Sequence, residues 1–237
     1  MIKSQTTNLE SWKPKTELGR KVKNREITDL SEILDKGLTI LEPEIVDTLL
    51  PNLQTELLEV GQSKGKFGGG KGSIWKQTQK KTSEGNTIKF STFAVVGNKD
   101  GFVGIGFAGS KETVPARSKA IRQAKLNIIK IRRACGSWDC DCKKAHSIPF
   151  QVSGKSGSCE VVLMPAPRGT GIKSEKKCKK IINLSGINDV YTRTQGHTAT
   201  KLNLFKACFN ALAALTKIKM PHKFIEESGC IDGSANK

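Results

Sequence analysis

Three cysteines and one histidine lie within twelve residues near the middle of the chain, in the segment CGSWDCDCKKAH. The four are Cys135, Cys140, Cys142 and His146. Thiolates and imidazole suit tetrahedral zinc, and four protein ligands leave no open coordination position for a substrate. A zinc ion held by this segment would therefore be structural and would fasten a linker. The alternative is a set of ordinary reduced thiols, because the spacing differs from the usual pair of cysteines two residues apart.

Cysteine use in the rest of the chain argues against disulfides. The chain has 237 residues and seven cysteines, an odd number with uneven spacing. The first thirty residues lack an apolar signal segment, and no stretch approaches the roughly 20 apolar residues of a membrane helix. We therefore expect a cytoplasmic chain with reduced thiols or metal ligands. Cys159, Cys178 and Cys208 are expected to be small apolar residues on strands or helices.

Charge is the strongest compositional signal, and it is unevenly distributed. The formal net charge is +18. Residues 26–60 contain nine acidic side chains and one basic side chain, whereas residues 61–145 contain eighteen basic and five acidic side chains. The basic part suits a polyanion, and the acidic part suits a protein neighbour or the basic part itself. A basic surface that serves solubility alone is the weaker interpretation over so long a stretch.

The N-terminal region predicts an arm followed by two small helices. Residues 1–25 are polar, basic and without periodicity, which is typical of an extended arm. A short helix should follow, capped near Asp29 and ended by Gly37. A second should begin at Pro43. Both are acidic with an apolar face, and helices this short should dock on another surface because they are unstable alone.

The next residues predict a first α+β domain. A strand at LQTELLEVG precedes a Gly/Lys insertion at residues 63–73, which is expected to be mobile. Residues 88–106 have the pattern of a β-hairpin around an Asp100-Gly101 turn. A helix should begin near Pro115 and end at the basic run 130–133, with one face buried at steps of four residues. That face contains Ala116, Ala120, Ala124 and Ile128.

A second α+β domain follows the cysteine segment. Its predicted elements are strands at SIPFQVSG and SCEVVLMPAP, a helix at KSEKKCKKIINLSG, a strand at NDVYTRTQG and a long helix at HTATKLNLFKACFNALAALTK. The long helix should bury a face made of Leu204, Cys208, Leu212 and Leu215. The predicted division is an N-terminal extension at 1–54, a first domain at 55–133, a Cys/His linker at 134–147, a second domain at 148–219 and a loosely held tail at 220–237.

Two glycine patterns imitate nucleotide sites without completing them. GIGFAG at residues 104–109 matches G-x-G-x-x-G, but its strand belongs to a predicted hairpin instead of a parallel βαβ unit. The pattern at residues 65–71 is followed by Gly72, where a phosphate-binding loop needs Ser or Thr. The chain has three histidines and no G-x-S-x-G elbow. We therefore expect no enzyme.

The basic side chains of the first domain indicate RNA instead. Double-stranded RNA presents phosphates and a wide, shallow minor groove that proteins read mostly by shape. A sheet-and-helix module with basic loops fits that target, and the scarcity of aromatic residues disfavours a reader that stacks single-stranded bases. The predicted RNA-binding residues are Lys64, Lys66, Lys71, Lys76, Lys80, Lys81, Lys89, Arg117, Arg122, Lys125, Lys130, Arg132 and Arg133.

Four blocks of the sequence resemble a known family. VVGNKDGFVGIGFAGSKE, KAIRQAKLNIIKIRRACGSW, HSIPF and LMPAPRGTGI are similar, in order, to the fifth small-subunit ribosomal protein (the S-five family) in its archaeal form. The resemblance runs from about Pro43 to Lys217. It implies a double-stranded-RNA-binding-like domain followed by a second α+β domain of the S-five C-terminal type, with a basic and acidic N-terminal extension.

The resemblance also implies a function. Members of the family are structural proteins of the small ribosomal subunit that bind ribosomal RNA beside proteins of the S-four and S-eight families. They influence decoding accuracy and line the mRNA entry region with the S-three and S-four families. By position, the resemblance marks residues 79–86 as an RNA-contacting loop. It also adds Arg168, in the PAPRG turn, to the predicted RNA-binding residues.

The leading hypothesis is therefore a structural protein of the cytoplasmic ribosome that supports assembly and decoding. A free-standing regulator that binds double-stranded RNA is the runner-up, since the basic first domain alone would permit it. A nucleotide-dependent enzyme rests only on the glycine patterns. Binding to RNA through several phosphates should be sensitive to salt.

Overall fold

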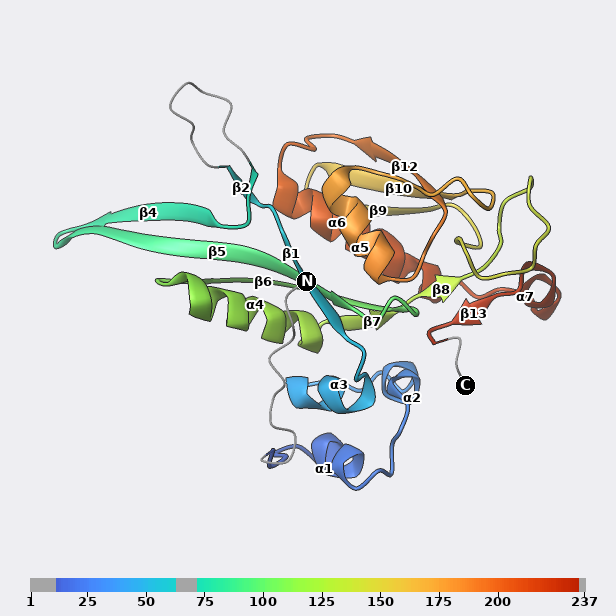
Figure 1. The fold of residues 1–237 in the computed structure, drawn as a ribbon, viewed down its shortest axis with the longest axis horizontal. Helices are drawn as coiled ribbons and strands as arrows, with labels where there is room; N and C mark the ends of the chain where they lie inside the picture. Colours follow the sequence, from blue (N-terminus) through green and yellow to red (C-terminus); the bar gives the residue numbers. More distant parts are fainter. Residues whose placement is uncertain (1–11, 63–71, 235–237) are drawn as a thin grey trace. The chain divides into compact units, whose positions relative to one another are not determined.

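The computed structural model describes residues 12–62 and 72–234 (Figure 1). The chain divides into two compact units. The first contains the chain up to Val96 together with Gly104–Ile128, and the second contains Gly97–Val103 and the chain from Ile129 onward. Each unit combines helices with a β-sheet, which confirms the predicted α+β class. In the described parts of the chain, no helix is long and apolar enough to span a membrane.

Three short helices precede the first sheet. They are α1 (Glu17–Lys23), α2 (Leu30–Asp35) and α3 (Pro43–Leu49). The predicted α2 and α3 are confirmed, with a left-handed Gly37 after α2 and proline as the first residue of α3. α1 corrects the prediction of an extended arm, and the Thr16 side chain caps it by accepting a hydrogen bond from the Gly19 amide at 3.1 Å. Residues 1–11 of the predicted arm lie outside the described residues.

One buried carboxylate ties the start of this region to α3. Glu42, the residue before α3, accepts a hydrogen bond from the Trp12 indole N–H at 2.9 Å. It also accepts from the backbone amides of Lys15 at 2.9 Å and Thr16 at 2.7 Å. Burial alone would raise the pKa of Glu42, but these hydrogen bonds outweigh burial and lower the pKa below its ordinary value. The carboxylate that anchors the start of α1 therefore loses its proton at a lower pH than an ordinary glutamate does.

The first sheet has five strands (Figure 1). They are β1 (Gln54–Leu58), β4 (Lys76–Thr82), β5 (Gly85–Gly97), β6 (Phe102–Ser110) and β7 (Ile128–Lys130), in the order β1-β5-β6-β7 with β4 paired to β5. The predicted hairpin is confirmed by β5 and β6, which a left-handed Gly101 helps to connect. β4 was not expected, because all of its residues are polar and exposed and no apolar alternation marks it.

A small strand pair adjoins the part of the insertion that is not described. β2 (Gly61–Gln62) pairs antiparallel with β3 (Gly72–Ser73). The predicted mobile insertion at residues 63–73 falls mostly on residues 63–71, which lie outside the described residues.

α4 (Thr113–Leu126) packs on this sheet through an alanine face. The face consists of Ala116, Ala120 and Ala124, which are buried as predicted. Ala120 and Ala124 of this face form one buried cluster with Ala94 and Val96 of β5. β6 can approach the helix closely because Gly104 and Gly106 have no side chain, and a Cβ at either position would collide with the α4 backbone. The G-x-G pattern therefore serves strand-to-helix packing.

α4 ends earlier than predicted. The helix stops at Leu126, and residues 128–133 form β7 and β8 (Arg132–Arg133) in place of a basic last turn. Asn127 already leaves the helical conformation. Ile128 is buried on β7, and as a β-branched residue it favours a strand. Ile128 fits the predicted four-residue spacing of buried positions, but it is buried on a strand and not on the helix.

The second unit is built on a four-stranded sheet with two helices on one face (Figure 1). Its strands are β9 (Val152–Ser156), β10 (Cys159–Pro165), β11 (Ile172–Lys173) and β12 (Val190–Gln195), in the order β11-β12-β10-β9. β11 is parallel to β12, and the other pairs are antiparallel. The helices are α5 (Lys176–Leu184) and α6 (Lys201–Lys217). The predicted apolar face of α6 is buried, namely Leu204, Cys208, Leu212 and Leu215.

The C-terminal tail is held more firmly than predicted. It contains α7 (His222–Ser228) and β13 (Ile231–Asp232), and β13 pairs antiparallel with β8. Arg132 forms a two-point ion pair with Asp232, at 2.5 Å and 2.9 Å. The polar composition of the tail predicts a loose segment. The strand and the arginine that hold it lie about a hundred residues earlier in the chain, so no local sequence pattern reveals them.

Candidate functional site

The β4–β5 hairpin carries four of the predicted RNA-binding residues. They are Lys76, Lys80 and Lys81 on β4 and Lys89 on β5. Every residue from 76 to 89 is exposed. The two strands pair from Lys76 opposite Ser91 to Thr82 opposite Gly85, so residues 79–86 are the tip of a two-stranded ribbon (Figure 1). The hairpin presents positive charge along its length, and Glu84 is its only acidic residue.

Other predicted RNA-binding residues differ in exposure. Arg122 on α4 and Arg168 in the loop between β10 and β11 are exposed. Arg117 on α4 and Lys130 on β7 are half-buried. The remaining basic residues of the insertion, Lys64, Lys66 and Lys71, lie outside the described residues.

Three predicted RNA-binding residues have partners within the chain instead. Lys125 is buried, and its ammonium lies 2.7 Å from Asp47 of α3. Arg133 is also buried, 2.6 Å from Asp100 and 3.0 Å from the carbonyl of Gly233. Arg132 is paired with Asp232, as described above. A buried cation needs a paired anion to offset its desolvation, so we assign Lys125 and Arg133 to the stability of the fold. Arg132 is half-buried, and its ion pair with Asp232 holds the C-terminal strand.

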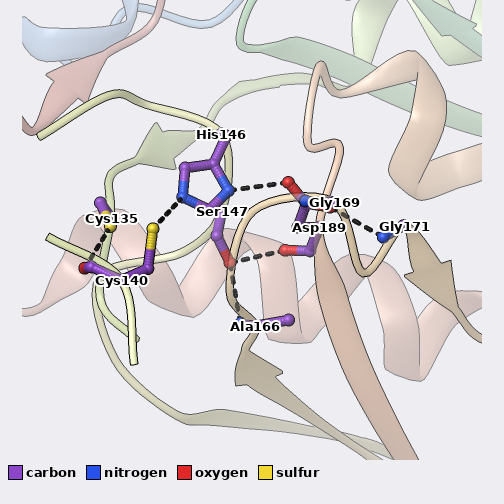
Figure 2. Close-up of polar contacts among 8 residues, drawn as sticks. All are labelled: Cys135, Cys140, His146, Ser147, Ala166, Gly169, Gly171 and Asp189. Carbon is purple, nitrogen blue, oxygen red and sulfur yellow. Dashed lines mark hydrogen bonds and ion pairs between the residues drawn. The ribbon is translucent and has the colours of Figure 1, made fainter. Parts of the chain in front are cut away.

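The cysteine segment gathers its four predicted ligands at one point. The ligand atoms of Cys135, Cys140, Cys142 and His146 all lie within 4.8 Å of one another. Cys140 Sγ is 3.8 Å from His146 Nε2, and the Cys135 thiol donates to the carbonyl oxygen of Cys140 at 3.0 Å (Figure 2). Ligands around a tetrahedral zinc ion lie about 3.5–3.8 Å apart. A small contraction of the cluster would therefore complete the coordination shell.

A carboxylate that sequence reasoning missed orients the histidine. Asp189 Oδ2 is 2.8 Å from His146 Nδ1, and both side chains are buried. Asp189 Oδ1 accepts from the backbone amides of Gly171 at 2.7 Å and Gly169 at 3.1 Å. Because a carboxylate accepts hydrogen bonds, Nδ1 carries the proton and Nε2 faces the thiols (Figure 2). The sequence offered no signal for this pairing, since the two residues are 43 positions apart.

The PAPRG turn is connected to the same cluster. The Ser147 hydroxyl donates to the backbone carbonyl of Asp189 at 2.5 Å and accepts from the Ala166 amide at 3.2 Å. A hydrogen bond from the Arg168 backbone amide is the main cause that lowers the pKa of Cys140 to about 6. Burial raises the pKa of Cys135 to about 11. Cys140 therefore becomes a thiolate more readily than Cys135 does.

Known families match both units. The model described as ribosomal protein S5, N-terminal domain, matches residues 74–132, and the model described as ribosomal protein S5, C-terminal domain, matches residues 154–223. The chain is 50% identical over 227 residues to small ribosomal subunit protein uS5 of Nanoarchaeum equitans, which covers 96% of this chain and 97% of that protein. It is 47% identical to the uS5 of Staphylothermus marinus, over 90% of this chain and 92% of that protein. The chain belongs to the ribosomal protein S5 family.

Membership in the S5 family confirms the predicted fold and function class. A chain of this family is a structural constituent of the small ribosomal subunit, and its place is on the ribosome. The free-standing regulator and the nucleotide-dependent enzyme lose their support, and the G-x-G glycines have a packing role instead. The two S5 matches leave residues 133–153 uncovered, so the Cys/His cluster falls between them.

Proposed function

We propose that this S5-family chain serves the small subunit as an RNA-binding scaffold without catalytic activity of its own. Its partners would be small-subunit ribosomal RNA, proteins of the S-four, S-eight and S-three families, and mRNA at the entry region. It would support subunit assembly and decoding accuracy in the cytoplasmic ribosome. The net charge of +18 and the exposed basic hairpin support this proposal.

The β4–β5 hairpin is the observation that carries the RNA contact. From residue 76 to residue 89 both strands are exposed on both faces, so this ribbon buries no apolar side chain within the chain. A two-stranded ribbon without apolar packing is marginal in water. Its four lysines would gain most from a polyanion, because each phosphate they neutralise releases condensed counterions.

Residues outside the hairpin extend the proposed contact. Arg122 and Arg168 are exposed, Arg117 and Lys130 are accessible in part, and Lys64, Lys66 and Lys71 remain expectations from the sequence. The acidic helices α2 and α3 suit a different neighbour. Of the acidic residues in these helices, Asp47 is already used within the first unit through Lys125.

The test is binding of the full chain to small-subunit ribosomal RNA as a function of salt. A variant with Lys76, Lys80, Lys81 and Lys89 replaced by Ala is compared with a charge-matched control in which Lys206, Lys217, Lys219 and Lys223 are replaced. All four control lysines are exposed and lie outside the predicted set. The slope of log K against log salt should become shallower by about 3 in the hairpin variant, since each phosphate contact contributes roughly 0.7–0.9. Equal slopes for the two variants would remove the hairpin from the interface.

A further inference from the structure

The Cys/His cluster has no role in the proposed RNA contact. Among the described residues it is the one group of three or more ligating side chains close enough to share a metal ion. Of the four other cysteines, Cys159, Cys178 and Cys208 are buried on regular elements, where a thiol serves as a small apolar side chain, and Cys230 is half-buried and lies outside the cluster. Cys140 and Cys142 are only half-buried and lie on irregular backbone. Apolar packing therefore does not explain why these thiols converge.

We infer that Cys135, Cys140, Cys142 and His146 hold one structural zinc ion, and that Asp189 positions the histidine for it.

The donor set selects the metal. Thiolates are soft ligands that favour zinc over the oxygen-seeking magnesium and calcium ions, and imidazole is a good fourth ligand. Four protein donors within 4.8 Å of one another close the shell, so no coordination position remains for a reacting water or substrate. Zinc bound here holds the backbone together and performs no chemistry.

Asp189 provides an independent observation that points to a metal. Ligating histidines commonly donate their second ring N–H to a carboxylate, which fixes the tautomer and the orientation of the ring. Asp189 does this to His146, and the amides of Gly169 and Gly171 hold the carboxylate in turn. The ring therefore presents Nε2 toward Cys140 at 3.8 Å (Figure 2). A buried imidazole aimed in this way at three thiols is preorganised for a fourth ligand.

The turn beside the cluster holds the residue that positions the histidine. The backbone amides of Gly169 and Gly171 donate to Asp189. The hydroxyl of Ser147, the residue after His146, accepts from the Ala166 amide of the same turn and donates to the Asp189 carbonyl. Asp189 is therefore fixed on several sides before any ion binds.

The ion would order a segment that is otherwise weakly held. Residues 136–145 contain no helix or strand, and the backbone contacts that hold the segment lie mainly at its two ends. They include the Ala134–Ser147 bridge, a hydrogen bond from the Cys135 amide to the Ser228 carbonyl at 3.0 Å, and bonds from the Asn188 and Asp189 amides to the His146 carbonyl. Lys143 adopts a left-handed conformation, with φ of 51°, that costs a non-glycine residue free energy. Trp138 on this segment is 98% exposed, so it contributes no burial. Metal coordination supplies the constraint that packing does not.

The first experiment measures metal in the full chain purified under reducing conditions. We expect one zinc ion per chain by elemental analysis. After exchange with cobalt(II), we expect the visible bands of tetrahedral coordination and the near-ultraviolet charge-transfer bands of cobalt–thiolate bonds. The substitutions Cys140→Ser and Cys142→Ser should each remove the stoichiometric ion. Cys230→Ser is the matched control, because this cysteine is also half-buried and lies outside the cluster.

A double-mutant comparison tests whether Asp189 affects zinc binding through His146. Asp189→Asn should weaken zinc binding about 10- to 100-fold in competition with a chelator, as for other residues that orient metal ligands. In a His146→Cys background, which keeps four ligands without the imidazole, Asp189→Asn should change the affinity much less. A merely structural role would give the same loss in both backgrounds.

Several results would overturn the inference. Wild-type protein that folds without metal and shows no cobalt–thiolate bands on titration excludes the site, even if the serine variants cannot be purified. Metal that survives Cys140→Ser and Cys142→Ser is bound elsewhere. Equal effects of Asp189→Asn in the two backgrounds remove the positioning role. None of these results bears on RNA binding by the hairpin, which is measured separately.

Discussion

The β4–β5 hairpin and the segment from β8 to the Cys/His cluster are both rich in basic residues, but they use them in opposite ways. On the hairpin every lysine is exposed, and the described contacts between the strands are mainly those of the backbone. At β8, Arg132 and Arg133 are drawn into ion pairs with Asp232 and Asp100. Positive charge is therefore exposed and available to the proposed RNA contact in one region, and it forms ion pairs within the chain in the other.

The difference shows that a charge count does not reveal where the charge acts. Lys125 and Lys89 are both lysines of the basic first domain, yet one is buried against Asp47 and the other is exposed on a strand. A buried ion pair is costly to break because the remaining charge is left without its partner, whereas an exposed lysine contributes little to stability. The comparison predicts separable effects on stability and on RNA binding.

The largest effect on stability is expected at Arg133. Arg133→Ala would leave Asp100 and the Gly233 carbonyl without the guanidinium that now bonds them, and we expect a loss of about 3 kcal/mol in the free energy of unfolding. Urea denaturation followed by far-ultraviolet circular dichroism measures it. Arg168→Ala is the control, since that side chain is exposed, and it should stay within about 0.5 kcal/mol of wild type. Similar losses for the two variants would contradict the distinction between paired and exposed arginines.

Next in size is the Lys125–Asp47 pair, which joins α4 to α3. Lys125→Ala should cost about 2 kcal/mol, because it removes the ammonium that pairs with the largely buried Asp47 side chain. Removing both partners should cost less than the sum of the single substitutions, and the same denaturation measurement gives the coupling. Strict additivity would mean that the two side chains do not stabilise each other.

Glu42 gives a smaller effect that depends on pH. Glu42→Gln should cost about 1 kcal/mol, because a neutral amide cannot accept all the hydrogen bonds that the carboxylate takes from Trp12, Lys15 and Thr16. The pKa of Glu42 is lowered in the fold, so its contribution is present above the pKa of the unfolded chain and is lost as pH falls through the lower folded value. The difference between wild type and variant in thermal unfolding should therefore shrink in acid. A difference that grew in acid would reverse the assigned sign.

The smallest effect on stability is expected for the hairpin. Replacing Lys76, Lys80, Lys81 and Lys89 by Ala should change the free energy of unfolding by no more than about 0.5 kcal/mol, because these side chains are exposed. The same variant should lose RNA affinity. A loss of several kcal/mol in stability would mean that these lysines support the fold, and the RNA result would then need another explanation.

The elements that the sequence predicted are those in which local pattern and tertiary packing agree. The alanine step of α4, the hairpin turn at Asp100-Gly101 and the apolar face of α6 each combine a strong local signal with a buried face. α1, β4 and β13 escaped prediction because their partners lie elsewhere: Glu42 anchors the start of α1, β5 pairs with β4, and β8 pairs with β13.

The candidate sites follow the same rule. The Cys/His cluster was predictable because its four ligands fall within twelve residues. The contact of Asp189 with His146 was not predictable, because the two residues are 43 positions apart and only the tertiary fold brings them together. For the same reason the sequence could count Lys125 and Arg133 as basic but could not foresee Asp47 and Asp100 as their partners.

Acetylation of lysines in the free protein and in assembled small subunits, read by mass spectrometry, tests the contrast between exposed and paired basic residues most directly. Lys76, Lys80, Lys81 and Lys89 should react readily in the free chain and become protected in the subunit, whereas Lys125 should react slowly in both. Hairpin lysines that stay equally reactive in the assembled subunit would contradict the RNA-facing role of the hairpin. Rapid modification of Lys125 in the free, folded chain would contradict its assignment to the interior.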